Sequence, residues 1–100
     1  MQRLTRSMTH TLLAFLEAPR SWRYGYDLMK VADVSSGTLY PLLARLSEDE
    51  WLESRWQESE YPGRPPRQLY RLTATGRMRA RQALARAQAS WLRAARTSET

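Results

Sequence analysis

Two groups of side chains in this sequence of 100 residues could make polar contacts with another molecule. The first group lies between residues 35 and 45 and has short or basic side chains: Ser35, Ser36, Thr38, Pro41 and Arg45. The second group is Arg64 and Arg67, which stand beside Gly63 and three prolines. A guanidinium group binds phosphate oxygens and the edge of guanine, so both groups suit recognition of a nucleic acid.

Residues that could perform catalysis or hold a metal are scarce. The sequence has a single histidine, His10, and no cysteine, which leaves no thiolate nucleophile, thiolate metal site or histidine cluster. We interpret His10 as a surface or interface residue. The acidic residues near the middle of the chain have no histidine or glycine-rich phosphate loop beside them, and we interpret them as a solvated surface: Glu48, Asp49, Glu50 and Glu53. We therefore expect no catalytic residue, no metal ligand and no cofactor.

Basic charge is concentrated in the last third of the chain. The formal net charge is +6, from 16 basic and 10 acidic residues. Residues 64–100 hold nine basic residues and one acidic residue, whereas residues 35–63 hold two and six. Arginine makes up nearly all of the basic residues, which favours a nucleic-acid partner, although codon usage in a GC-rich genome gives the same bias.

The sequence has no uninterrupted apolar run of about 18 residues, the length that a membrane-spanning helix needs. The first residues also lack the charged and then apolar order of a signal peptide. We therefore expect a cytoplasmic protein that does not span a membrane, and the absence of cysteine fits that compartment.

Apolar spacing predicts four helices and two strands. Steps of three and four residues favour a helix over 4–17, a shorter one opening near Tyr24, and a third that starts near Ser35 and buries Leu39, Leu42, Leu43 and Leu46. Alternation favours antiparallel strands over 51–57 and 67–73, joined by a glycine- and proline-containing loop. Thr73 is the expected N-cap of a final helix that starts at 74. The predicted fold is mainly α with a small β-hairpin.

The final helix carries an apolar stripe that the small body is not expected to bury. Ala80, Leu84, Ala87, Trp91 and Ala95 recur at steps of four and three, close to a coiled-coil seam. We therefore expect a homodimer whose interface includes residues from both ends of the chain: Leu4, Met8, Leu12, Leu84, Ala87 and Trp91. The expected division is a DNA-binding domain over 1–73, a dimerisation helix over 74–97 and a tail over 98–100.

The order of three helices, a hairpin and a last helix is that of a winged helix-turn-helix, whose third helix enters the major groove of DNA while the hairpin, or wing, reaches the adjacent backbone. The sequence also resembles the PadR family of bacterial transcriptional regulators. The strings that carry the resemblance are Gly25-Tyr-Asp-Leu28, Ser36-Gly-Thr-Leu-Tyr-Pro41, Trp51-Leu-Glu-Ser54, Gly63-Arg64 and Tyr70-Arg-Leu-Thr73 with Gly76.

The resemblance implies a homodimeric repressor that binds a pseudo-palindromic operator and, in several members, is released by a small-molecule effector. It places Ser35, Ser36, Thr38, Tyr40 and Pro41 at the DNA end of the third helix and Arg64 in the wing. Tyr40 could contact a phosphate or pack on the second helix. Trp91 could line an effector pore, as a tryptophan does in some small members, or be plain dimer core.

A second reading belongs to another class of protein. Winged helices also serve as protein-interaction modules, and the arginine-rich last helix could dock on an acidic partner. The small polar residues that begin the third helix, together with a basic wing, favour double-stranded DNA as the partner instead.

Overall fold

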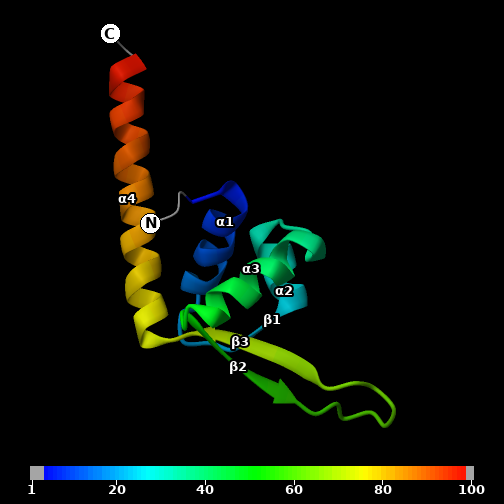
Figure 1. Ribbon diagram of the computed structural model, residues 1–100. Coiled ribbons are helices and arrows are strands. Elements are labelled where there is room, and N and C mark those ends of the chain that lie inside the picture. Colours follow the sequence, from blue (N-terminus) through cyan, green and yellow to red (C-terminus); the bar gives the residue numbers. More distant parts are fainter. Residues whose placement is uncertain (1–3, 99–100) are drawn as a thin grey trace.

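The computed structural model describes residues 4–98, and it contains four helices and three strands in that range. The elements are α1 (Arg6–Leu16), β1 (Arg23–Tyr24), α2 (Gly25–Ala32), α3 (Ser36–Glu48), β2 (Leu52–Gln57), β3 (Arg67–Leu72) and α4 (Ala74–Ser98). Helices α1 to α3 cover one face of the small sheet, the β2–β3 hairpin projects from the body, and α4 runs alongside α1 and beyond it (Figure 1). The mainly α fold with a β-hairpin wing is confirmed.

The sheet has one more strand than the sequence predicts. Its order is β1–β3–β2, and both neighbouring pairs are antiparallel. The sequence predicts strands over 51–57 and 67–73 alone, but Arg23 and Tyr24 also pair with Tyr70 and Leu69 of β3. A strand of two residues is too short to show alternation, so the sequence does not predict β1, whereas the predicted antiparallel pairing of the two hairpin strands is confirmed.

One hydrophobic core joins the helices to the inner face of the sheet. Large residues that are almost fully buried come from α1, α2, α3 and β3: Leu12, Phe15, Leu28, Leu39, Leu43 and Leu72. Val31 of α2 is apolar but 48% exposed. Only Leu28 and Ala32 are buried among the apolar side chains of that helix, because eight residues present a narrow face to the core.

The connection from α2 to α3 is short and tightly turned. Asp33 has the left-handed φ of 55°, which ends α2, and the amide of Val34 donates to the Met29 carbonyl at 3.1 Å. His10 of α1 lies beside this end, with its Nδ1 3.0 Å from the Ala32 carbonyl oxygen. Since a carbonyl only accepts, Nδ1 carries the proton in this contact. His10 thus joins α1 to the end of α2.

Thr73 fixes the start of α4 against the rest of the body. Its hydroxyl accepts a hydrogen bond from the Gly76 amide at 2.9 Å and donates one to the Glu50 carbonyl at 2.8 Å. The predicted N-cap is therefore confirmed. A Cβ atom on Gly76 would collide with the carbonyl oxygen of Trp51, so only glycine permits α4 to begin so close to the turn before β2.

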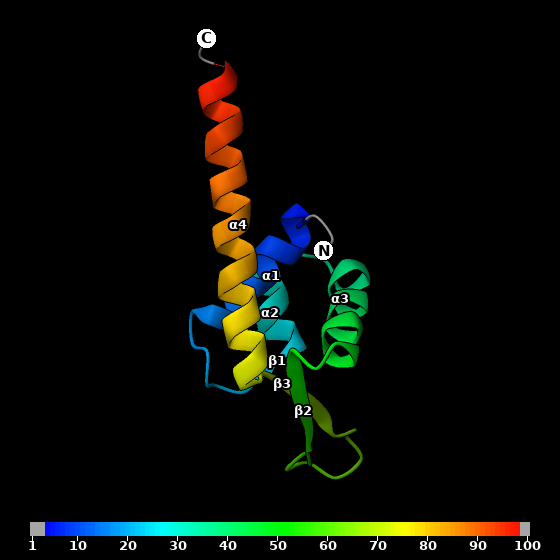
Figure 2. The same ribbon diagram turned by 60° about the vertical axis from the view of Figure 1, so that its left-hand side comes forward.

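Helix α4 leaves the body about halfway along its length. Ala80 and Ala83 are buried and Leu84 is partly buried against the core, whereas residues 88–94 are all exposed. The far half of α4 stands clear of the other elements (Figure 2). The first part of the predicted seam is therefore covered by the chain's own body. Over residues 4–98, no helix has both the length and the apolar character needed to cross a membrane.

Candidate nucleic-acid interface

The outer face of α3 is open to solvent from its N-cap onward. The side chains of the first predicted group are all exposed: Ser35, Ser36, Thr38, Pro41 and Arg45. Ser35 stands at the N-cap, but its hydroxyl lies 3.3 Å from the Thr38 hydroxyl and makes no cap bond to the backbone. The start of α3 therefore presents small polar groups that can approach another molecule closely.

Pro41 lies inside α3, five residues after the helix begins at Ser36. Proline has no backbone N–H, so it cannot donate to the carbonyl four residues earlier, that of Gly37. Gly37 is exposed and has open space where a side chain would be. The first turn of α3 thus offers backbone as well as side chains on its outer face.

Tyr40 packs on the second helix, which is one of the two arrangements that the sequence left open, and it keeps an exposed side. Its ring lies against Gly25 at the start of α2, yet the residue stays 47% exposed. It also lines a hollow of about 320 Å³ between α3 and the base of the wing, together with Tyr24, Arg67 and Tyr70. Burial raises the pKa of the Tyr70 hydroxyl above 10.0, and neighbouring Tyr40 adds to the rise.

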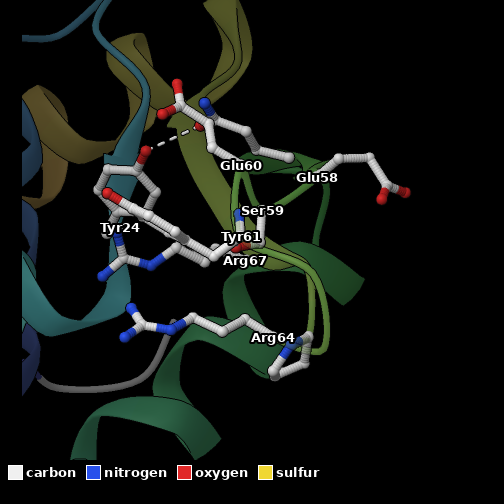
Figure 3. Close-up of a pocket in the computed structure, with 9 residues that line it drawn as sticks. Tyr24, Glu58, Ser59, Glu60, Tyr61, Arg64 and Arg67 are labelled. Carbon is white, nitrogen blue, oxygen red and sulfur yellow. Dashed lines mark hydrogen bonds between the residues drawn. The ribbon is translucent and has the colours of Figure 1, made fainter.

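The two wing arginines each lie over an aromatic ring. The Arg67 guanidinium carbon is 4.4 Å from the centre of the Tyr24 ring, and that of Arg64 is 5.2 Å from the centre of the Tyr61 ring. These four residues line one hollow of about 460 Å³ near the tip of the wing, where the two arginine side chains run side by side (Figure 3). A stacked guanidinium keeps its N–H edges available for phosphate oxygens.

A second set of stacked side chains covers the outer face of the sheet nearer the body. The centre of the Trp22 ring lies 4.5 Å from the guanidinium carbon of Arg55 and 4.2 Å from that of Arg71. Arg71 also pairs with Glu53 at 2.6 Å. Leu69 lies on this face rather than in the main core, and it is only 3% exposed.

Sequence reasoning missed the aromatic partners Trp22, Tyr24 and Tyr61. The alternation that predicts β2 and β3 does not indicate which ring meets each arginine. The available signal was the pair of aromatic residues two positions apart, at 22 and 24, beside a sheet whose outer face carries arginine.

The predicted dimer residues fall into different environments. Leu12 is fully buried in the core of the single chain, so the expectation that it contacts a second copy is wrong. Leu4, Met8 and Leu84 are partly buried against the same core, and Ala87 is partly exposed on α4. Trp91 is 68% exposed. Periodicity identified apolar faces correctly but could not tell which faces the chain itself covers.

The winged helix-turn-helix matches a known family over most of its length. The model of the transcriptional regulator PadR-like family matches residues 12–82, which include α2, α3, the wing and the start of α4. The chain belongs to the PadR-like family. The resemblance noted in the sequence is thereby confirmed, and this PadR-like chain is a DNA-binding transcriptional regulator.

Solved structures give the same result. A PadR-like transcription factor from Bacteroides fragilis is 31% identical, with 94% of this chain and 89% of that chain covered and a TM-score of 0.62. A PadR family transcriptional regulator from Eggerthella lenta is 36% identical, with 81% and 70% covered and a TM-score of 0.60. A Streptococcus mutans protein at 23% identity shares the fold, with 90% and 84% covered and a TM-score of 0.65. No curated protein sequence matches the PadR-like chain.

Proposed function

We propose that this PadR-like regulator is a homodimeric repressor that binds a pseudo-palindromic operator, with α3 in the major groove and the wing on the adjacent backbone. Such a protein would act in the cytoplasm. The single observation that carries the proposal is the shared exposure of the α3 outer face and the two ring-stacked wing arginines.

The α3 face supports base recognition. Thr38, Pro41 and Arg45 follow one another at steps of three and four, so they form one strip along the exposed side of the helix. Small residues at the N-terminal end let the helix backbone approach the groove floor, and Arg45 can reach a guanine edge or a phosphate further along.

The wing supports backbone contact. Arg64 stands beside Gly63, whose φ of 85° turns the loop, and residues 60–67 are exposed throughout. Arg64 and Arg67 add two positive charges to this exposed surface. Positive groups on an extended loop suit the regularly spaced phosphates of DNA.

The far half of α4 supports dimerisation. Trp91 and its neighbour Leu92 are both well exposed on a stretch that no other part of residues 4–98 covers. A 25-residue helix is about 37 Å long, and only its first half contacts the body. We propose that residues 1–73 bind DNA and that α4 pairs with α4 of a second copy, with Trp91 in the seam and able to contact a flat effector there.

The test is a titration of labelled DNA from upstream of the chain's own gene, followed by fluorescence anisotropy over a range of salt concentrations. Arg64→Ala is expected to weaken specific and non-specific binding alike and to reduce the salt slope by about 0.9 per operator half-site. Arg79→Ala is the matched control, because it removes the same charge from the exposed surface of α4.

Two outcomes would contradict the proposal. Failure of the parent protein to bind any DNA more tightly than random sequence would favour a protein-interaction module. An unchanged affinity and salt slope in Arg64→Ala would remove that residue from the DNA contacts.

A further inference from the structure

We propose that Tyr24 is the positioning residue of the wing: from the short strand β1 it fixes the outer ends of both wing strands, at the root of the wing loop, and sets the guanidinium of Arg67 for contact with a phosphate. The DNA part of this proposal rests on the proposed function. The positioning itself is a property of the protein without DNA, so the two can be tested separately.

The root of the wing loop, residues 58–66, is the last pair of residues in the ladder between β2 and β3. Gln57 ends β2, Arg67 begins β3, and the two are cross-strand partners. Beyond them the chain runs through residues 58–66, where no strand pairing holds the two arms together. A contact that fixes Gln57 and Arg67 therefore sets the direction in which the wing loop leaves the sheet.

Tyr24 contacts both members of this pair. Its hydroxyl donates a hydrogen bond to Oε1 of Gln57 at 2.8 Å, and its ring lies under the Arg67 guanidinium at 4.4 Å. The sheet order places β3 between β1 and β2, so the Tyr24 side chain reaches across β3 to the far strand. Figure 3 shows the ring beside Arg67 and the hydrogen bond that leaves its hydroxyl.

The register explains why these three side chains meet. Tyr24 pairs with Leu69, and Arg67 lies two residues before Leu69 on the same strand, so Tyr24, Arg67 and Gln57 share the outer face of the sheet. Tyr24 is held in turn by this pairing and by its position directly before α2. The positioning group is therefore attached to the rigid body and not to the wing.

Stacking on Tyr24 leaves Arg67 suited to bind a phosphate. The ring contacts the flat face of the guanidinium, and the N–H donors point outward in the plane. Arg67 also lines both hollows, the one beside α3 and the one near the wing tip. A backbone phosphate at this junction would thus be contacted between the recognition helix and the wing.

The neighbouring stack at Trp22 serves as an internal comparison. Trp22 joins Arg55 of β2 to Arg71 of β3, and these lie closer to the body than the root pair, by two residues on β2 and four on β3. It covers the sheet where Leu69 and the ladder already hold the strands. A substitution at Trp22 is therefore expected to lower the stability of the fold, whereas one at Tyr24 is expected to speed amide exchange at the root of the wing loop.

The experiment compares Tyr24→Leu, which removes ring and hydroxyl, with Tyr24→Phe, which keeps the ring. The first readout needs no DNA: proton NMR of the Arg67 δ and ε positions, together with amide hydrogen exchange over residues 56–68. Tyr24→Leu is expected to abolish the upfield ring-current shifts of Arg67 and to speed exchange near the root, while Tyr24→Phe keeps the shifts.

The second readout is operator affinity. Tyr24→Leu is expected to weaken operator binding roughly three- to tenfold. This is the change in affinity that follows from losing one exposed cation–π contact and the ordering of the Arg67 side chain that it provides. The double variant Tyr24→Leu/Arg67→Ala should lose less affinity than the sum of the two single losses, because the ring acts through that arginine. Additive losses would show that Tyr24 acts elsewhere.

Unchanged Arg67 shifts and unchanged exchange in Tyr24→Leu would overturn the proposal. If Tyr24→Leu does not fold, Gln57→Leu removes the hydrogen bond alone, and faster exchange at the root is then the expected result. If the parent protein binds no DNA, the proposed function fails while the NMR and exchange results still decide the role of Tyr24.

Discussion

The ring of Tyr40 on α3 lies against the backbone of Gly25 at the start of α2, in the space where any other residue would carry its side chain. A Cβ atom on Gly25 would lie 2.5 Å from the tyrosine hydroxyl oxygen and 3.0 Å from the adjacent ring carbon. Gly25 is buried under this ring. The angle between α2 and the recognition helix is thus set in part by the absence of a side chain at position 25.

Gly25→Ala is expected to displace the Tyr40 ring into solvent and to destabilise the protein by about 1 kcal/mol. Removing the ring should relieve the collision, so in a Tyr40→Ala background the same glycine substitution should be neutral or slightly stabilising, since alanine favours helices. Urea unfolding of the four proteins in this cycle measures the coupling. Additive effects would show that the two residues do not compete for space.

Substitutions on the outer face of α3 are expected to change which DNA sequence is preferred. Replacement of Thr38 by valine or of Arg45 by glutamine should cost roughly 1–3 kcal/mol at one base position if the side chain contacts a base edge. Arg64→Ala, in contrast, should weaken binding to all DNA sequences alike. Sequencing of DNA selected by each variant makes the comparison, and a selected motif identical to that of the parent protein would exclude base contact by the altered residue.

The elements with long periodic patterns could be predicted from the sequence, because each one buries a face of its own. Leu39, Leu43 and Leu46 of α3 are buried as their spacing indicates, whereas Leu42, which was predicted with them, is only partly buried. Thr73 caps α4 through its hydroxyl. The β2–β3 ladder has Leu52 opposite Leu72 on the inner face, in agreement with the alternation. Each of these features depends on residues close together in the sequence, so their spacing and type are enough to predict it.

Features that depend on which surfaces meet could not be predicted in this way. Strand β1 exists because Arg23 and Tyr24 pair with a distant strand, and two residues carry no period of their own. Leu12 belongs to an apolar face that α2 and α3 already cover, which periodicity alone cannot distinguish from a face that awaits a partner. The aromatic rings under the arginines likewise become neighbours only when the sheet forms.

Thr73→Val is expected to destabilise the protein by about 1–2 kcal/mol without changing its fold. The substitution keeps the shape of the side chain but removes the hydroxyl that accepts from the Gly76 amide and donates to Glu50. Thermal unfolding measures the loss. Thr75→Val on the exposed surface of the same first turn is the control, and an equal loss in both variants would contradict the capping role.

Stability is expected to fall at alkaline pH through Tyr70. Burial raises the pKa of its hydroxyl above 10.0 in the folded protein. The stabilisation is therefore full below the unfolded pKa of about 10 and is lost as the pH rises from there through the folded pKa. Tyr70→Phe should lose less stability than the parent protein between about pH 9 and pH 11. Tyr40→Phe should show an intermediate loss of stability, since Tyr40 contributes to the raised pKa of Tyr70. Equal pH profiles would show that Tyr70 does not titrate differently in the two states.

Trp91→Glu is expected to dissociate the proposed dimer, because it places a charge at the most exposed large apolar residue on the far half of α4. Sedimentation equilibrium should show at least a tenfold rise in the dimer dissociation constant, or about 1.4 kcal/mol. Trp56→Glu is the matched control, since that tryptophan is similarly exposed, at 65%, but lies on the wing. Leu84 is unsuitable for this test because it packs partly against the core of the single chain, where a charge would disturb folding itself. A dimer of unchanged strength in Trp91→Glu, or equal weakening in both variants, would exclude the far half of α4 as the interface.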